Sequence, residues 1–318
     1  MKIQPTLLIL FTLLISSVFS IVKLRSDAHA TQQAETPPPA VQNSPQPARK
    51  TPSVSTTRDG QALLNDVHLK LVSQSSIRAR LLQTFHEKDK FVIGRGEYLQ
   101  AAPMRLKYTL EMEQDGGTGK LIQVCDSNIL WSHQEISPIP SGLKPEEMSQ
   151  YIRVTRRNVK RILDEIRNHE RIDNSSQYLM TELGMGGLPA LFASLSVNMD
   201  FGEVQEISYN ETPCYVLTGT WTQARQQEWE VRKSGQREFM TQFRPAAVEV
   251  WVDQRNLFPM QIRYLRKHSG KLLPLFTLTF EDVRLGEPVD PSEFVYTPPT
   301  SITPTDTTRE FLDRLMRQ

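Results

Sequence analysis

The residues of this chain that could do chemistry are few and far apart. The histidines outside the N-terminal segment share no metal-binding or catalytic motif; they are His68, His86, His133, His169 and His268. Ser132 and His133 are neighbours, so on a β-strand they point to opposite faces and cannot pair as nucleophile and base. Asp126 lies in a predicted turn, where an aspartate is usually structural. We therefore expect no catalytic residue, no metal site and no cofactor, in a protein that is not an enzyme.

The chain has two cysteines, Cys125 and Cys214, which have neither metal-site spacing nor a CxxC motif. In an exported protein the two could form a disulfide, which would stabilise the fold by roughly 4 kcal/mol in the chain-entropy model if the geometry allows it. Two separate buried thiols fit the sequence as well. A distance above about 7 Å between the two Cα atoms would exclude the bond.

Composition favours a globular protein without a nucleic-acid partner. The 318 residues include 37 Lys and Arg and 36 Asp and Glu, so the formal net charge is +1. A nucleic-acid-binding domain usually carries a clear basic excess, which this chain lacks. The length allows one large domain or two small ones.

The N-terminal segment predicts export. Lys2 precedes an apolar run at about residues 7–22, and residues 28–30 read Ala-His-Ala, a small-x-small cleavage site. The run is also about the minimum length for a membrane span. Residues 1–30 are therefore either a signal peptide or an N-terminal transmembrane anchor. In both cases we expect the rest of the chain in the periplasm or cell envelope, tethered to the inner membrane if the segment is retained.

Three further regions follow from composition. Residues 31–57 are rich in Pro, Gln, Ser and Thr and lack apolar side chains for a core, which predicts a disordered linker. The folded domain is expected over residues 58–300. Residues 301–318 are expected to form a tail with a short amphipathic helix.

One stretch indicates what the domain is built from. Residues 104–112 read MRLKYTLEM, in which apolar and polar residues alternate without a break. Successive side chains of a strand point to opposite faces, so this pattern predicts a β-strand with one apolar and one polar face. Such a strand belongs in an antiparallel sheet that is wet on one side and covered on the other.

The order of elements predicts an α+β fold. A helix over residues 61–72 precedes five antiparallel strands that end near Gln134. Two or three helices are expected between about residues 145 and 195, and a second block of strands from about 200 to 283. The polar stretch 223–242 predicts a surface excursion. We expect one large curved antiparallel sheet, an unclosed half-barrel, with helices covering its concave face.

What covers the apolar face decides the function. In one interpretation the helices pack on it as a plain core; in the other, a cavity between sheet and helices takes an acyl chain. Met104 and Met112 are flexible enough for a pocket that repacks. The ligand would then contact an apolar lining that consists of Tyr98, Met104, Leu106, Tyr108, Leu110, Ile122, Trp131, Trp221, Val250, Ile262, Tyr264 and Phe280.

Three short motifs resemble the LolA-type periplasmic lipoprotein carriers and their wider superfamily, which includes LppX-like folds. Residues 101–110, AAPMRLKYTL, resemble the family's strand in which a proline precedes an alternating apolar segment. Residues 124–133, VCDSNILWSH, resemble its turn and strand that read Asp-Gly-x-x-Leu-Trp, with Ser127 in place of the glycine. Residues 290–299, DPSEFVYTPP, resemble its closing segment. The resemblance covers roughly residues 59–300.

The resemblance implies an unclosed barrel with a helical lid that carries lipids or lipid-modified proteins across an aqueous compartment. It implies an exported, non-enzymatic carrier or binding protein whose partner is a lipid or a lipoprotein acyl chain. The alternative is a membrane-tethered interaction protein that keeps the fold without cargo and binds envelope proteins. One position departs from the carriers: where they have a basic residue before the proline that holds the lid closed, this chain has Ala102.

Overall fold

The computed structural model describes residues 58–87, 90–114, 117–137, 151–168, 186–232 and 245–316. The predicted N-terminal segment and linker lie outside these residues, as does the helix expected near Pro145. No helix within the described ranges is both long enough and apolar enough to cross a membrane.

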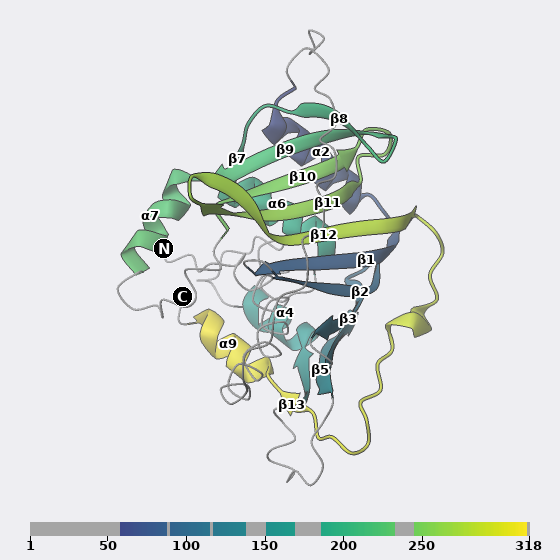
Figure 1. Ribbon diagram of the computed structural model, residues 1–318. Coiled ribbons are helices and arrows are strands. Elements are labelled where there is room, and N and C mark those ends of the chain that lie inside the picture. The colour runs from purple at the N-terminus through teal and green to yellow at the C-terminus, as the bar shows by residue number, and fades with distance from the viewer. Residues whose placement is uncertain are drawn as a thin grey trace, which may run out of the picture.

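One large sheet dominates the fold (Figure 1). Its strands are β1 (Ser76–Glu87), β2 (Lys90–Ala101), β3 (Arg105–Gln114), β4 (Gly117–Asp126), β5 (Ile129–Ser137), β6 (Ile152–Asn158), β7 (Met199–Phe201), β8 (Gln205–Tyr209), β9 (Thr212–Trp221), β10 (Ala247–Asp253), β11 (Pro259–His268), β12 (Lys271–Leu285) and β13 (Thr305–Asp306). The 13 strands follow the order β13-β6-β5-β4-β3-β2-β1-β12-β11-β10-β9-β7, and β8 also pairs with β9. All pairings are antiparallel except β13 with β6. The two ends of this order do not pair with each other, so the predicted α+β fold with an unclosed antiparallel sheet is confirmed.

Strand β3 shows why the sequence forms this sheet. Leu106, Tyr108, Leu110 and Met112 are all buried, whereas the residues between them are exposed or half-buried. This is the alternation of a strand with one covered face. Met104 has φ of 53° and lies in the turn before the strand, not in the strand as predicted.

Five α-helices accompany the sheet in the described ranges: α2 (Gly60–Val72), α4 (Val159–Arg167), α6 (Gly187–Asn198), α7 (Gln223–Arg232) and α9 (Thr308–Met316). Helix α2 begins where the Asp59 side chain accepts a hydrogen bond from the Gln61 amide. Helices α2 and α6 pack on each other near β7 and β9, whereas α4 and α9 lie near β5 and β6. Helix α7 falls in the predicted excursion, of which residues 233–242 lie outside the described chain.

The region between about residues 145 and 195, where the sequence predicts only helices, also contains a strand. Residues 156–168 have helical spacing in the sequence, but Arg156 to Asn158 belong to strand β6, and the helix begins only at Val159. Strand β6 was not predicted at all. It is formed by pairing with β5, in which His133 lies opposite Val154. The tail helix α9 lies where the sequence predicts one.

Both faces of the sheet are covered in part. On the face toward the helices, here called the concave face, side chains from strands and helices form one large apolar cluster. On the opposite, convex face, residues 286–304 connect β12 to β13 and include the short 3-10 helix η1 (Pro291–Phe294). We call these residues the C-terminal strap. Its Phe294 is buried against Leu99, Ala101 and Val124 in a second, smaller cluster.

Candidate ligand-binding face

The concave face is assembled by the strand register. Residues directly opposite each other in an antiparallel ladder point to the same face. Tyr98 on β2 lies opposite Tyr108 on β3, and Val250 on β10 lies opposite Ile262 on β11. All four belong to the large cluster, together with side chains of α2, α4, α6 and α9. The register therefore produces one continuous apolar surface beneath the helices.

Nine of the twelve residues that the sequence proposes as a lining lie in this cluster: Tyr98, Leu106, Tyr108, Leu110, Trp221, Val250, Ile262, Tyr264 and Phe280. They come from six strands, β2, β3, β9, β10, β11 and β12. The indole Nε1 of Trp221 donates to the Pro245 carbonyl over 2.7 Å, so the polar atom of this large side chain is satisfied.

The other three proposed lining residues do not lie on the concave face of the sheet. Met104 is in a turn. Ile122 packs against the small convex cluster, because its neighbour Leu121 takes the concave position on β4. Trp131 has its ring 5.6 Å from that of Tyr296 in the strap. The sequence places the last two on the wrong face because strands β4 and β5 carry apolar residues on both faces.

Helix α6 is attached to the concave face at its first residues. The Tyr98 hydroxyl accepts a hydrogen bond from the Leu188 amide over 2.9 Å and donates one to the Gln100 side chain. Gly187 has φ of 54°, and a Cβ there would collide with the Tyr98 hydroxyl and the side-chain oxygen Oε1 of Gln100. Burial raises the pKa of Tyr98 well above its ordinary value, so this hydroxyl stays protonated.

This contact could not be predicted from the sequence, because Tyr98 and Leu188 are 90 residues apart. A tyrosine hydroxyl and a backbone amide therefore connect β2 to α6. Such a connection is short, neutral and buried, and its strength depends little on salt.

A buried polar pair lies among the apolar side chains of the concave face. The Tyr108 hydroxyl donates to Gln83 Oε1 over 2.8 Å. Gln83 is only 2% exposed, and its Nε2 has no hydrogen-bond partner among the described residues. Gln83 lies opposite Leu278 and Gly94 in the register. An unpaired amide donor in an apolar interior is costly, and no sequence pattern around Gln83 predicts it.

The residues that could do other chemistry are not brought together. Ser132 and His133 lie on the two faces of β5, and the His133 ring contacts Tyr296 on the convex face. Cys125 and Cys214 are buried and form no disulfide with each other. They lie on strands β4 and β9, which are separated by six strands in the sheet order. Of the two alternatives that the sequence left open, the structure has separate thiols. Burial raises the pKa of Cys125 to about 12, so its thiol is unreactive.

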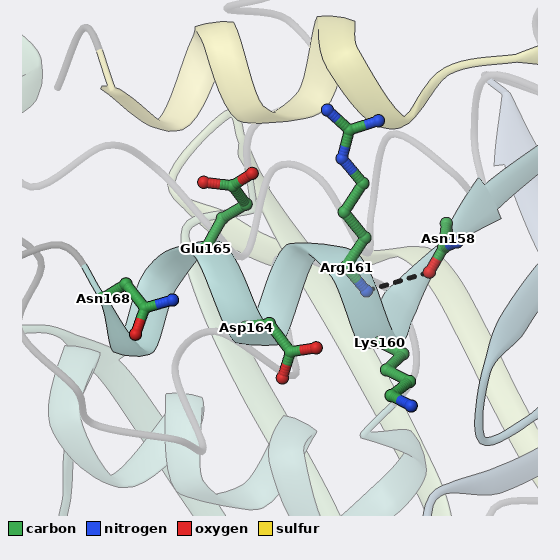
Figure 2. Close-up of a pocket in the computed structure, with 6 residues that line it drawn as sticks. All are labelled: Asn158, Lys160, Arg161, Asp164, Glu165 and Asn168. Atoms are coloured by element: carbon green, nitrogen blue, oxygen red, sulfur yellow. Dashed lines mark hydrogen bonds between the residues drawn. The ribbon is translucent and has the colours of Figure 1, made fainter.

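Figure 2 shows a pocket of another kind, along α4. It has a volume of about 300 Å³ and is lined only by polar and charged residues, namely Asn158, Lys160, Arg161, Asp164, Glu165 and Asn168. The side chains of Lys160 and Asp164 point away from those of Arg161 and Glu165 (Figure 2). Asn158 caps the helix by accepting from the Arg161 amide over 2.8 Å. This pocket therefore runs along the polar side chains of α4 from its N-cap to its C-cap and is no part of the apolar face.

No protein-family model matches this chain, and no curated protein sequence matches it either. Forty-six chains of solved structures are similar to it, among them the following three. The complex structure of Pseudomonas aeruginosa MucA/MucB is 11% identical with a TM-score of 0.35, over 75% of this chain and 61% of that chain. This chain therefore spans about three fifths of that structure's length.

The other two similar structures are shorter, and the match to this chain covers almost their whole length. A domain from Vibrio parahaemolyticus assigned to outer membrane lipoprotein sorting is 10% identical, with a TM-score of 0.31 over 74% of this chain and 95% of that chain. The Mycobacterium tuberculosis lipoprotein LppX is 9% identical, with a TM-score of 0.33 over 73% of this chain and 97% of that chain. These are the kinds of protein that the sequence motifs resemble. At such TM-scores they carry no argument about function, which has to come from the geometry of the concave face.

Proposed function

We propose that this chain is an exported, non-enzymatic binding protein that holds an apolar ligand between the concave face and the helices on it. A lipid or a lipoprotein acyl chain is the ligand class that fits. The observation that supports the proposal is the continuous apolar cluster of the concave face, to which strands from both halves of the chain and four helices contribute. An apolar surface of this extent can contact a hydrocarbon chain in many positions, because it has few polar groups that would fix the orientation of a ligand.

Hydrocarbon burial is strong enough to supply the affinity. Each buried CH₂ contributes about 0.8 kcal/mol, so a chain of about ten methylenes gains about 8 kcal/mol, which corresponds to a micromolar dissociation constant. The free energy of moving the helices aside has to be subtracted from this gain. Longer acyl chains should therefore bind more tightly than short ones.

Helix α6 is the element that we propose as the lid. Its first residues are attached to β2 through the Tyr98 hydroxyl, and its last turn is attached to α2, where Gln61 Nε2 donates to the Ser196 carbonyl over 3.1 Å. Breaking the first contact while keeping the second would swing α6 away from the central strands. The ligand would then take the place of apolar side chains of α6, such as Leu191 and Phe192, which are now buried.

The N-terminal sequence supports a proposal for the cellular compartment of this protein. The apolar N-terminal run and the small-x-small site predict that the chain leaves the cytosol, and we propose the periplasm or cell envelope as its place of action. The proline-rich residues 31–57 would give the folded domain reach if residues 1–30 stay in the inner membrane.

Native mass spectrometry of the full chain, purified in a mild detergent, tests the proposal. We expect a bound lipid mass, and uptake of a fluorescent fatty acid after the lipid is removed. A Leu110→Phe substitution, which adds volume on the concave face, should reduce uptake, whereas Ile122→Phe on the convex face should not. Wild-type protein that carries no lipid and takes up no fatty acid would contradict the proposal, whether or not the variants fold.

A second function is favoured by one observation. The nine lining residues in the cluster are at most 7% exposed, so the chain itself already covers them. This is the state expected of a membrane-tethered interaction protein that keeps the fold without cargo and binds another envelope protein. The two functions differ in the experiment above: the tethered protein should retain residues 1–30 and show no bound mass at any stage.

A further inference from the structure

The turn between β11 and β12 combines exposed leucines with exposed cations. Residues 266–273, here called the hairpin end, read RKHSGKLL. Leu272 is 47% exposed and Leu273 is 37% exposed, and both Lys267 and Lys271 are exposed beside them. Lys267 lies directly opposite Leu272 in the register, so a cation and an apolar side chain share one face. Adjacent exposed leucines such as Leu272 and Leu273 form an apolar patch, and such patches often mark a surface that binds a partner or a membrane.

The cations of the hairpin end have no charge partner in the described chain. Between Asp253 and Glu281 the sequence has five Lys and Arg residues and no acidic residue. The two arginines of this stretch outside the hairpin end are paired, Arg255 with Asp253 and Arg263 with Glu249. For Lys267 and Lys271 no ion pair is found among the described residues. The hairpin end is therefore a site of uncompensated positive charge.

The neighbouring hairpin adds to the same region. Strand β1 pairs with β12 on one side and with β2 on the other. Phe91, near the start of β2, is 65% exposed. Phe91 lies opposite His86, whose pKa is lowered by burial and then by the charges of Arg266 and Arg263. Phe85 of β1 and Tyr264 of β11 both lie opposite Phe276 of β12 in the register, so the two hairpins extend from the same end of the sheet. Figure 1 shows β12 and β1 as neighbours in the sheet.

We propose that the hairpin end docks on the surface of an anionic bilayer, with its leucines in the boundary between headgroups and acyl chains and its lysines beside lipid phosphates. Apolar side chains flanked by Lys and Arg are the chemistry that binds such surfaces, since each basic residue near an anionic leaflet adds attraction and each apolar one adds burial. A protein partner would need acidic groups placed opposite each lysine, whereas a lipid surface supplies them without fixed positions. This inference goes beyond the proposed function and does not depend on it, because docking requires no ligand on the concave face.

A label at the turn itself tests the proposal in the full chain. Both native cysteines are buried, so Ser269→Cys introduces an exposed thiol for an environment-sensitive fluorophore. With vesicles of phosphatidylglycerol and phosphatidylcholine in equal parts, we expect a shift to a lipid-like emission and quenching by spin-labelled lipid. With phosphatidylcholine alone we expect neither. The signal is local, so membrane contact made by another part of the chain does not produce it.

Variants separate the two components of docking. Replacing Lys267 or Lys271 by Gln should lower the ratio of lipid-contacting to solvent-exposed label about fivefold for each lysine. Leu272→Ser with Leu273→Ser should abolish quenching while weak electrostatic attraction remains. Salt at about 1 M, where the Debye length is about 3 Å, should reverse docking of the wild-type hairpin.

The matched control places the same label at Ser73, an exposed residue just after α2, beside the exposed apolar residues Leu69 and Val72. This label should stay solvent-like with both kinds of vesicle. A label at residue 269 that stays solvent-like on anionic vesicles would overturn the proposal. Equal signals from residues 269 and 73 would overturn it as well, because the contact would then not be specific to the hairpin end.

Discussion

The two faces of the sheet are covered by different kinds of contact. On the convex face, the C-terminal strap is fixed by directional pairs: Arg78 forms two hydrogen bonds of 2.8 Å with the Glu293 carboxylate, and the Tyr296 hydroxyl lies 2.9 Å from His133 Nδ1. On the concave face, the helices rest on aliphatic and aromatic side chains, with the Tyr98 contact to α6 as a directional exception.

This difference indicates on which face a ligand could replace part of the protein that covers the sheet. A carboxylate–guanidinium pair or a tyrosine–imidazole contact has a fixed geometry that a lipid cannot reproduce. Apolar packing has no such requirement, and one hydrocarbon can replace another at similar volume. The concave face is therefore the one where a ligand could displace part of the protein, and the convex face is the one that keeps the sheet in shape while this happens.

The largest effect is expected from removing the apolar anchor of the strap. Phe294→Ala should lower the free energy of unfolding by about 3–5 kcal/mol, because Phe294 is buried and its loss leaves a cavity above β2 and β4. Urea titration measures the change. The neighbouring Val295 is 69% exposed, so Val295→Ala should change stability by less than about 0.5 kcal/mol. Equal losses in both variants would mean that the strap is not anchored through Phe294.

The next effect concerns the attachment of α6. Tyr98→Phe leaves the Leu188 amide without its acceptor and should cost about 1–3 kcal/mol of stability. If α6 is the lid, the same variant should also exchange a bound fluorescent fatty acid about tenfold faster, as measured by transfer to vesicles.

Tyr296→Phe is the control on the convex face. It removes a hydroxyl of the same chemistry from a contact with His133. Stability should fall by a smaller amount, and ligand exchange should not change. Faster exchange in Tyr296→Phe than in Tyr98→Phe would reverse the roles that we assign to the two faces.

A stability loss of similar size, without a change in ligand exchange, is expected from the buried polar pair. Gln83→Leu alone should cost about 1–3 kcal/mol, because the Tyr108 hydroxyl then lacks an acceptor. Gln83→Leu combined with Tyr108→Phe should lie within about 1 kcal/mol of wild type, since the Tyr108 hydroxyl that would lack an acceptor is then absent too. A double-mutant cycle on unfolding free energies measures this coupling. Additive losses would show that the two side chains are not a pair.

The sequence predicts the features that depend on the local period of apolar residues. It does not predict features that depend on contact with a distant segment, such as the face that a side chain occupies. The alternation in β3 is sufficient to predict a strand, and the motif at residues 290–299 is sufficient to predict the closing segment that contains the buried Phe294. The faces of Ile122 and Trp131 were wrong because the strap covers part of the convex side, so apolar residues occur on both faces of β4 and β5. The Tyr98 contact was missed because its partner lies on another element.

The smallest expected effect is a pH dependence that belongs to the convex face. Burial lowers the pKa of His133 and outweighs the neighbouring Glu135 carboxylate, which raises it; Lys120 lowers it further. The Tyr296 hydroxyl can donate to Nδ1 only while that nitrogen carries no proton. The folded state therefore favours neutral imidazole, and the unfolded chain binds a proton more readily. Stability from this contact is present above the ordinary histidine pKa of about 6.5 and is lost as the pH falls below it.

Unfolding free energies measured between about pH 8 and about pH 5 should therefore fall more steeply for wild type than for His133→Gln. His68 and His86 also have a lowered pKa, but both remain in the variant, so the difference between the two curves isolates His133. Fatty-acid exchange should stay the same in both proteins over this range, because His133 lies on the convex face, opposite the proposed ligand. If acid changed exchange only in the wild type, the strap would have to control the lid, and the division between a fixed and an exchangeable face would be lost.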